Sequence, residues 1–419
     1  MSGVGIANRT IFLLSVLVTG SVAGVAVWAI LFAMNVGISA IWDRVPVYLG
    51  DLYPVFMCLV GGLVIGLFIK RFGQYPEELP TVMAKVKETG RYEYGDIGRM
   101  SLGALLPLVF GGSVGPEAGL TGVIAGVCTW AGDRLKRFGS DFKELTQLGM
   151  YAAVSAIFTA PLYGFAGAMG GKRVHGEHEI LADKVSRAVV TLVAVAGAIL
   201  TILALTHYVG GGMSMPRFPR IEYGSDELVW LIPLALVGAA AGWLYCVLHH
   251  AFARVSERAG DRPVSKAVLA GLILGVCGVI LPFTMFSGET QSEEIMELWP
   301  TMTIAVLLLT GFVKIVVTAM CVNFGWRGGH FFPVIFAGIA IGYGMAAVSG
   351  VDPAFCVCAC TAATVGGVMR QPLMTVLLLF LCFPVEAVLA MAVAAVIGSY
   401  MPLPKSIGAI EKTDGGGSD

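Results

Sequence analysis

The sequence predicts an all-α polytopic membrane protein, and three observations support this fold class. Of the 419 residues, 57% are hydrophobic and only 13% are charged, whereas soluble globular domains contain ~25% charged residues. The mean hydropathy of +0.82 is that of a chain with long lipid-facing segments. Apolar runs of spanning length alternate with charged loops along the whole chain. Together with a net charge of −1, these values exclude a soluble enzyme, a disordered chain and a nucleic-acid binder.

The first apolar run begins close to Met1 and is too long for the hydrophobic region of a secretory signal, so we expect a spanning helix there and no cleaved leader. Several later runs exceed one span and contain Gly or Pro near the middle, which predicts broken helices. The runs lie near residues 11–34, 53–69, 100–131, 146–170, 188–207, 228–251, 267–286, 303–323, 331–349 and 355–401.

Basic residues are divided unequally between the loops. They are dense in residues 70–99, 134–143, 172–187 and 254–266, and sparse in 35–52, 208–227 and 287–301. The positive-inside rule therefore places the first group and both termini in the cytoplasm. Runs 100–131 and 146–170 would then begin and end on the same side. Each is expected to turn at depth, near Gly111–Pro116 and near Ala160–Pro161.

A sequence pattern occurs twice and predicts an internal duplication. Residues 111–116 read G-G-S-V-G-P and residues 328–333 read G-G-H-F-F-P. Each is followed by a Gly-bearing apolar helix and then by an Ala-rich helix that ends in Pro-Leu. The first half would start inside and the second half outside, which is the signature of an inverted repeat. We expect repeats at 1–223 and 224–409, followed by a flexible tail at 410–419.

The two Gly-rich breaks carry chemistry that suits an anion. A helix that begins inside a membrane presents unpaired N–H groups and the positive end of its dipole. Pro116 and Pro333 fit a first helical turn, and the preceding glycines allow close approach of the backbone to a ligand. Such a site would bind an anion loosely enough for permeation. The alternative is that both breaks are ordinary re-entrant turns packed on their neighbours.

The breaks resemble two motifs of the CLC family of chloride channels and chloride/proton exchangers. Residues 112–116 are similar to its G-[KR]-E-G-P motif, residues 328–333 to G-G-x-F-x-P, and residues 159–162 to N-A-P-L. The resemblance implies an antiparallel inverted repeat, a homodimer in the lipid bilayer and one pore per subunit. It also implies an anion site at the backbone amides of Val114, Gly115, His330 and Phe331.

The departures from the family pattern bear on mechanism. The gating and proton-accepting Glu of the first motif is replaced by Val114, and the segment 165–170 has no acid where exchangers carry an inner proton Glu. The family's G-S-G-I-P loop corresponds to residues 72–76. Gly73, Gln74 or Tyr75 would there take the place of the coordinating Ser. Tyr400 lies in the region of the family's late pore Tyr.

Three side chains at the breaks have two readings each. Glu117 is either a helix-start residue that favours the dipole or a displaced gate and proton site. His330 either lines the pore or bonds to a neighbouring carbonyl. Ser113 either lends its hydroxyl to the ion or caps the next helix.

The remaining motifs point to a metal only weakly. Cys356, Cys358 and Cys360 would point in successive directions on a helix, so small-residue packing is favoured over a metal or redox site. The stretch H-G-E-H-E at 175–179 lacks the i, i+4 histidine spacing of helical metal sites and reads as a solvated loop. An intramembrane metalloenzyme that uses both features is the reading from another class.

The sequence as a whole predicts a multi-pass plasma-membrane protein that passively conducts chloride or similar small anions without proton coupling. We expect no enzymatic activity and no cofactor, with the anion as transported ligand. The alternatives are an anion/proton exchanger with an unfamiliar proton site, such as Glu117 or His330, and a non-conducting descendant of the family.

Overall fold

The computed structural model describes most of the chain, and its helices form two compact units. The described residues are 3–43, 50–77, 82, 85–86, 89, 91–135, 142–158, 160–162, 166, 181–211, 216–221 and 224–404. One unit comprises Met1–Arg44, Gln74–Val109 and Pro116–Met215, and the other comprises Val45–Gly73, Phe110–Gly115 and Pro216–Asp419. These units do not coincide with the two predicted sequence halves, so the repeat boundaries stay a prediction.

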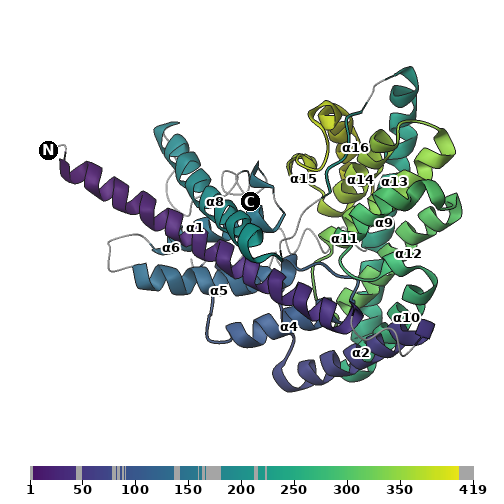
Figure 1. Cartoon of the computed structure of the whole chain (residues 1–419), viewed down its shortest axis with the longest axis horizontal. Helices are drawn as coiled ribbons and strands as arrows, with labels where there is room; N and C mark the ends of the chain where they lie inside the picture. The colour runs from purple at the N-terminus through teal and green to yellow at the C-terminus, as the bar shows by residue number, and fades with distance from the viewer. Residues whose placement is uncertain are drawn as a thin grey trace. The chain divides into compact units, whose positions relative to one another are not determined.

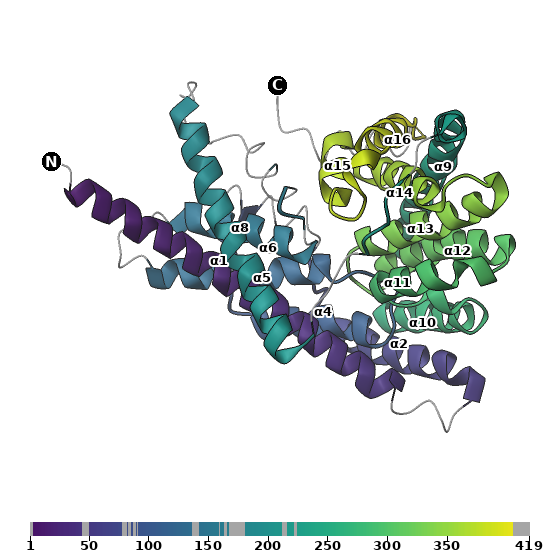
Figure 2. The same cartoon turned by 45° about the horizontal axis from the view of Figure 1, so that its top comes forward.

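Among the described residues, the long helices of the first unit are α1 (Gly3–Ile38), α4 (Ile97–Val109), α5 (Glu117–Leu135), α6 (Phe142–Ile157) and α8 (Leu181–Val209). Helix α1 packs against α8, and both also contact α6 (Figures 1 and 2). Glycine makes this contact close, because a Cβ on Gly24 would lie 2.6 Å from the carbonyl oxygen of Ala198.

The second unit contains α2 (Tyr53–Phe72) and all the long helices of the C-terminal half. These are α9 (Ser225–Arg258), α10 (Pro263–Ile280), α12 (Ile304–Asn323), α13 (Phe331–Ser349), α14 (Pro353–Met369), α15 (Pro372–Leu379) and α16 (Val388–Tyr400), with the short α11 (Glu289–Leu298) between α10 and α12. Helix α2 packs on α10, and α14 is enclosed by α9, α13 and α16.

The predicted helices and breaks are confirmed by the described residues. The run 100–131 divides into α4 and α5 around residues 110–116, and α6 ends at Ile157, ahead of Ala160–Pro161. The run 355–401 divides into α14, α15 and α16. Seven of the described helices are long and apolar enough to cross a membrane.

One predicted loop contains a helix. Residues 287–301 include α11, which begins after Gly288. The backbone N–H of Gly288 donates to the Gln291 side chain at 3.2 Å, and Ser292 Oγ donates to the Gly288 carbonyl at 2.6 Å. The first bond satisfies an N–H that a helix start otherwise leaves unpaired, and this favours a helix in so polar a segment. The second adds a donor to a carbonyl that already accepts from the Ser292 N–H.

The packing pairs of the two halves correspond. Helix α1 contacts α4, α5, α6 and α8, and α9 contacts α12, α13, α14 and α16. The helices on either side of the Gly-rich breaks also pair alike, α4 with α5 and α12 with α13. This correspondence agrees with the internal duplication that the sequence predicts.

Glycine at the crossing of α14 and α16 gives a first testable prediction. A Cβ on Gly398 would overlap the carbonyl oxygen of Ala363, whereas a Cβ on the exposed helical Gly98 would meet nothing within 4 Å. We expect Gly398→Ala to destabilise the protein by about 1–3 kcal/mol through overpacking. Gly98→Ala should be neutral or stabilising by up to about 1 kcal/mol. Thermal unfolding in one detergent checks this, and equal midpoints for the two variants would contradict it.

Candidate functional site

The two Gly-rich breaks lie side by side and are joined by backbone hydrogen bonds. The Gly115 N–H donates to the Gly329 carbonyl at 2.7 Å, and the Gly329 N–H donates to the Gly115 carbonyl at 2.7 Å. The two residues form an isolated antiparallel bridge. Positions more than two hundred residues apart in the sequence are thus held together, as the repeated motif predicts.

This bridge decides which amides remain for a ligand. The N–H of Gly115 is used by Gly329, and the N–H of Val114 donates to the Gly112 carbonyl at 2.8 Å. Within the described part of the chain, the His330 N–H has no hydrogen-bond acceptor. Of the four predicted amide positions, the structure therefore leaves His330, at the start of α13, as the clearest donor, and Phe331 is the first residue of that helix.

Val114 is packed rather than open. Its side chain is fully buried, and a Cβ on Gly328 would lie 2.6 Å from Val114 Cγ2. Gly328 is therefore required by the close approach of the first break. The hydroxyl of Ser113 shares a hydrogen bond with Thr318 Oγ1 of α12 at 3.0 Å. That bond crosses to another helix, so the Ser113 hydroxyl anchors the loop to α12.

The first break is also tied to the segment after α10. The N–H of Phe286 donates to the Gly111 carbonyl at 3.0 Å. Lys314 of α12 donates from Nζ to the Phe286 carbonyl at 2.7 Å and to the Met285 carbonyl at 2.7 Å. Residues 110–115 are consequently held by α12 at two points, through Ser113 directly and through Phe286.

A row of rings lies beside the start of α13. The His330 ring is 4.6 Å from the Phe331 ring and 5.3 Å from the buried ring of Tyr245, measured between centroids. Tyr245 stacks in turn on His249 at 5.7 Å. His330 itself is half-buried. Its side chain therefore packs against the rings of Phe331 and Tyr245.

His249 of α9 is held by Asn323 at the end of α12. Asn323 Nδ2 donates to the carbonyls of Ala319 at 2.8 Å and of His249 at 3.2 Å. His249 Nδ1 lies 3.1 Å from the same nitrogen. These contacts join α9 to α12 beside the ring of Tyr245.

Sequence reasoning missed Tyr245 and Lys314. Lys314 had a detectable signal, since it is the one charged residue of α12 and an ionisable group inside a span is a functional candidate by default. Tyr245 had none, because α9 contributes it from a helix without a motif, and only tertiary packing brings it to His330.

The other predicted pore residues stay a prediction, and the structure describes the surroundings of each. Gly73 and Gln74 are exposed after the end of α2. The Tyr75 hydroxyl donates to Asp96 Oδ2 at 3.3 Å, and burial together with the Asp96 carboxylate raises the pKa of Tyr75. Tyr400, the last residue of α16, is 77% exposed. Glu117 is buried at the first position of α5, and its carbonyl accepts a bond from Thr121 Oγ1.

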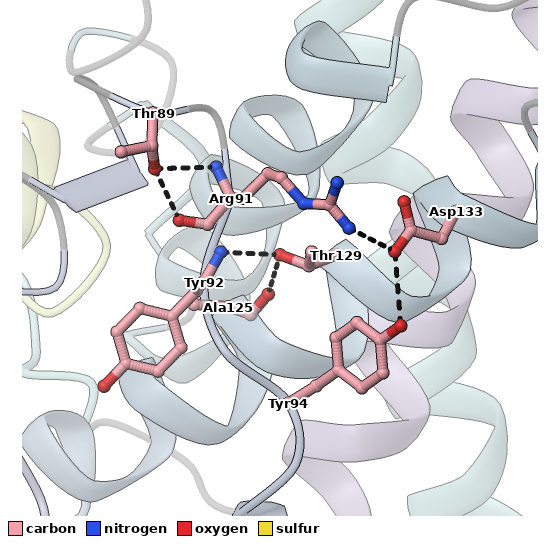
Figure 3. A network of polar contacts seen from close by, with 7 residues as sticks. All are labelled: Thr89, Arg91, Tyr92, Tyr94, Ala125, Thr129 and Asp133. Atoms are coloured by element: carbon pink, nitrogen blue, oxygen red, sulfur yellow. Dashed lines mark hydrogen bonds and ion pairs between the residues drawn. The ribbon is translucent and has the colours of Figure 1, made fainter.

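A polar network fixes the loop before α4 on the flank of α5 (Figure 3). Arg91 forms an ion pair with Asp133 at 2.7 Å, and the Tyr94 hydroxyl donates to the same carboxylate at 3.3 Å. The Tyr92 N–H donates to Thr129 Oγ1 at 3.1 Å. These contacts sit at a charged loop, and they orient the chain that leads into the first break.

Metal chemistry finds no support in the part of the chain that the structure describes. No group of three or more His, Cys, Asp or Glu residues converges there as a metal site. Cys356, Cys358 and Cys360 are free thiols buried in α14. The H-G-E-H-E stretch at 175–179 lies outside the described residues.

Comparison with known proteins gives consistent similarities. A family model described as "Voltage gated chloride channel" matches residues 61–402. The "Putative ion-transport protein YfeO" of Salmonella newport (strain SL254) is 26% identical over 354 residues, which cover 80% of this chain and 80% of that protein. The protein of the same name from Salmonella agona (strain SL483) gives the same values.

Two solved structures share the fold. A "slow cyanobacterial Cl-/H+ antiporter" superposes with a TM-score of 0.74 at 17% identity, covering 97% of this chain and 98% of that one. A "CLC-type fluoride/proton antiporter" superposes with a TM-score of 0.71 at 15% identity, covering 96% of both chains. The family model spans most of the chain, and the motifs that it shares meet in the structure at Gly115 and Gly329. This multi-pass membrane protein therefore belongs to the voltage gated chloride channel (CLC) family.

Proposed function

We propose that the protein passively conducts chloride or similar small anions across the plasma membrane, uncoupled from protons, through one pore in each subunit of a homodimer. It is a transport protein rather than an enzyme, it needs no cofactor, and both termini face the cytoplasm. Family membership and the curated ion-transport relatives support anion transport.

The observation that carries the proposal is the start of α13. The His330 N–H has no acceptor among the described residues, and it precedes a 19-residue apolar helix whose dipole is positive at this end. A backbone donor without a fixed charge binds a halide loosely, which suits an ion that must also leave.

The uncoupled mode is supported by Val114. At the position where exchangers of this family carry an ionisable gate, the side chain is an aliphatic group that is fully buried against Gly328. Such a group can neither accept a proton nor compete with the anion.

The second candidate function is anion/proton exchange. Both solved structures compared above are titled as antiporters that use protons. The observation that favours exchange here is Glu117, a carboxyl group only 1% exposed at the start of α5, since a buried acid in a membrane protein is a candidate proton site.

Purified protein in liposomes distinguishes the two modes. With a chloride gradient and a superimposed pH gradient, we expect the reversal potential to follow chloride alone, because Val114 offers no proton acceptor. A shift of the reversal potential with the pH gradient would establish exchange and overturn the uncoupled mode. Absence of flux for chloride, bromide and nitrate would overturn anion conduction itself.

The backbone of His330 can be tested by removing its N–H. His330→Pro deletes the donor, whereas His330→Ala keeps it and removes only the ring. Hydrogen bonds to charged groups contribute about 1.5–3 kcal/mol, so His330→Pro should raise the half-saturating chloride concentration about 10- to 150-fold. His330→Ala should stay within about 3-fold of the wild type. Equal values for two folded variants would contradict a role for this amide.

Glu117 can be tested with an isosteric variant. If the carboxyl group only favours the start of α5, Glu117→Gln should leave the pH profile of chloride flux unchanged and lower stability by about 0.3–1 kcal/mol. Flux recorded between pH 5 and pH 8 measures the profile. A profile that flattens in Glu117→Gln would identify Glu117 as a proton site and favour exchange.

A further inference from the structure

A lysine buried in a candidate membrane span is the feature that the proposed site does not use. Lys314 lies midway along α12, is 0% exposed and is the one charged residue of that helix. Its Nζ faces four consecutive backbone carbonyls of the segment after α10. The distances are 3.4 Å to Phe283, 3.2 Å to Thr284, 2.7 Å to Met285 and 2.7 Å to Phe286.

The surroundings of Nζ are those of an ammonium ion. All four polar neighbours are acceptors, and the face of the Phe336 ring lies 5.2 Å away. An ammonium group has three N–H donors and no acceptor, so the four carbonyls share three hydrogens and none of them faces a lone pair. Carbonyl oxygens and an aromatic face are also the neutral groups that solvate a cation best.

Among the described residues, Lys314 forms no ion pair with a carboxylate. The ion pairs found there join Lys85 to Glu77, Arg91 to Asp133 and Arg99 to Asp96, all in or beside the loop before α4. Carbonyl dipoles solvate the ammonium but leave its net charge in place. In surroundings of low dielectric constant that charge is felt over a long distance.

Lys314 is linked to the first Gly-rich break by hydrogen bonds through Phe286. Phe286 joins the two, because its carbonyl accepts from Lys314 and its N–H donates to Gly111. One helical turn further along α12, Thr318 bonds to Ser113. The four carbonyls occupy the donors of Lys314, so the lysine influences a nearby ion through its field and not by contact.

We propose that Lys314 is the fixed positive charge that makes the pathway prefer anions. This inference rests on the proposed function. In this proposal the amide at the start of α13 binds the ion. Lys314 determines that the ion is an anion, and it does so without contacting the ion.

The test compares neutral and charged replacements in reconstituted protein. Lys314→Gln keeps a donor for the carbonyls without the charge, and Lys314→Arg keeps the charge. For two unit charges about 10 Å apart at an effective dielectric constant of about 20, the effect is on the order of ten-fold. We expect the half-saturating chloride concentration to rise about that much in Lys314→Gln, with a matching fall in the chloride-to-potassium permeability ratio. Lys314→Arg should keep both values near those of the wild type.

A second pair of variants leaves the lysine in place. Thr318→Asp puts a carboxylate one turn from Lys314 and neutralises it, and Thr318→Asn is the isosteric uncharged control. A higher half-saturating chloride concentration in Thr318→Asp than in Thr318→Asn supports the inference. If Lys314→Gln does not fold, the test relies on this second pair. If the wild type conducts chloride and the charged and neutral members of each folded pair have the same half-saturating chloride concentration, the inference is wrong and the proposed function stands. If the wild type conducts no anion, the proposed function fails, and the inference with it.

Discussion

The buried amino group of Lys314 imposes the constraint around which the first Gly-rich break is arranged. A polar group within apolar helices is tolerated only when polar partners surround it, and here one turn of backbone supplies four carbonyls. Helix α10 ends at Ile280 just before that turn, and Phe286 adopts φ +58 within it, a conformation that non-glycine residues rarely take. The same turn then bonds to Gly111. The hydrogen bonds of one buried amino group therefore also position the loop that meets α13.

Close backbone approach is the second requirement, and it reduces what the site can offer. Gly115 and Gly329 pair through both their N–H groups, which is possible only because Gly328 has no side chain to collide with Val114. Each N–H used in this pairing is lost to a ligand. Among the described residues, this leaves the N–H of His330 at the start of α13 as the donor that our proposal uses.

The sequence was informative wherever a single local rule governs the outcome. Lipid solvation predicts the apolar helices, and the Gly-Gly pairs with Pro116 and Pro333 predict the breaks between α4 and α5 and between α12 and α13. Partners of individual groups could not be predicted, because pairing depends on distant segments. Nothing local indicates that the Gly115 amide is used by Gly329, that the Tyr75 hydroxyl meets Asp96, or that Tyr245 lies beside His330.

A weak ligand and a remote charge together resolve a conflict that any permeation site faces. A lysine in direct contact would hold a halide too tightly for rapid exit, whereas an amide alone would discriminate little by sign. In our proposal the two functions are separated, so that the field of Lys314 selects the ion and the start of α13 binds it briefly. The uncoupled mode that we propose depends on Val114 in the same way, because the aliphatic side chain buried at this position has no group that ionises.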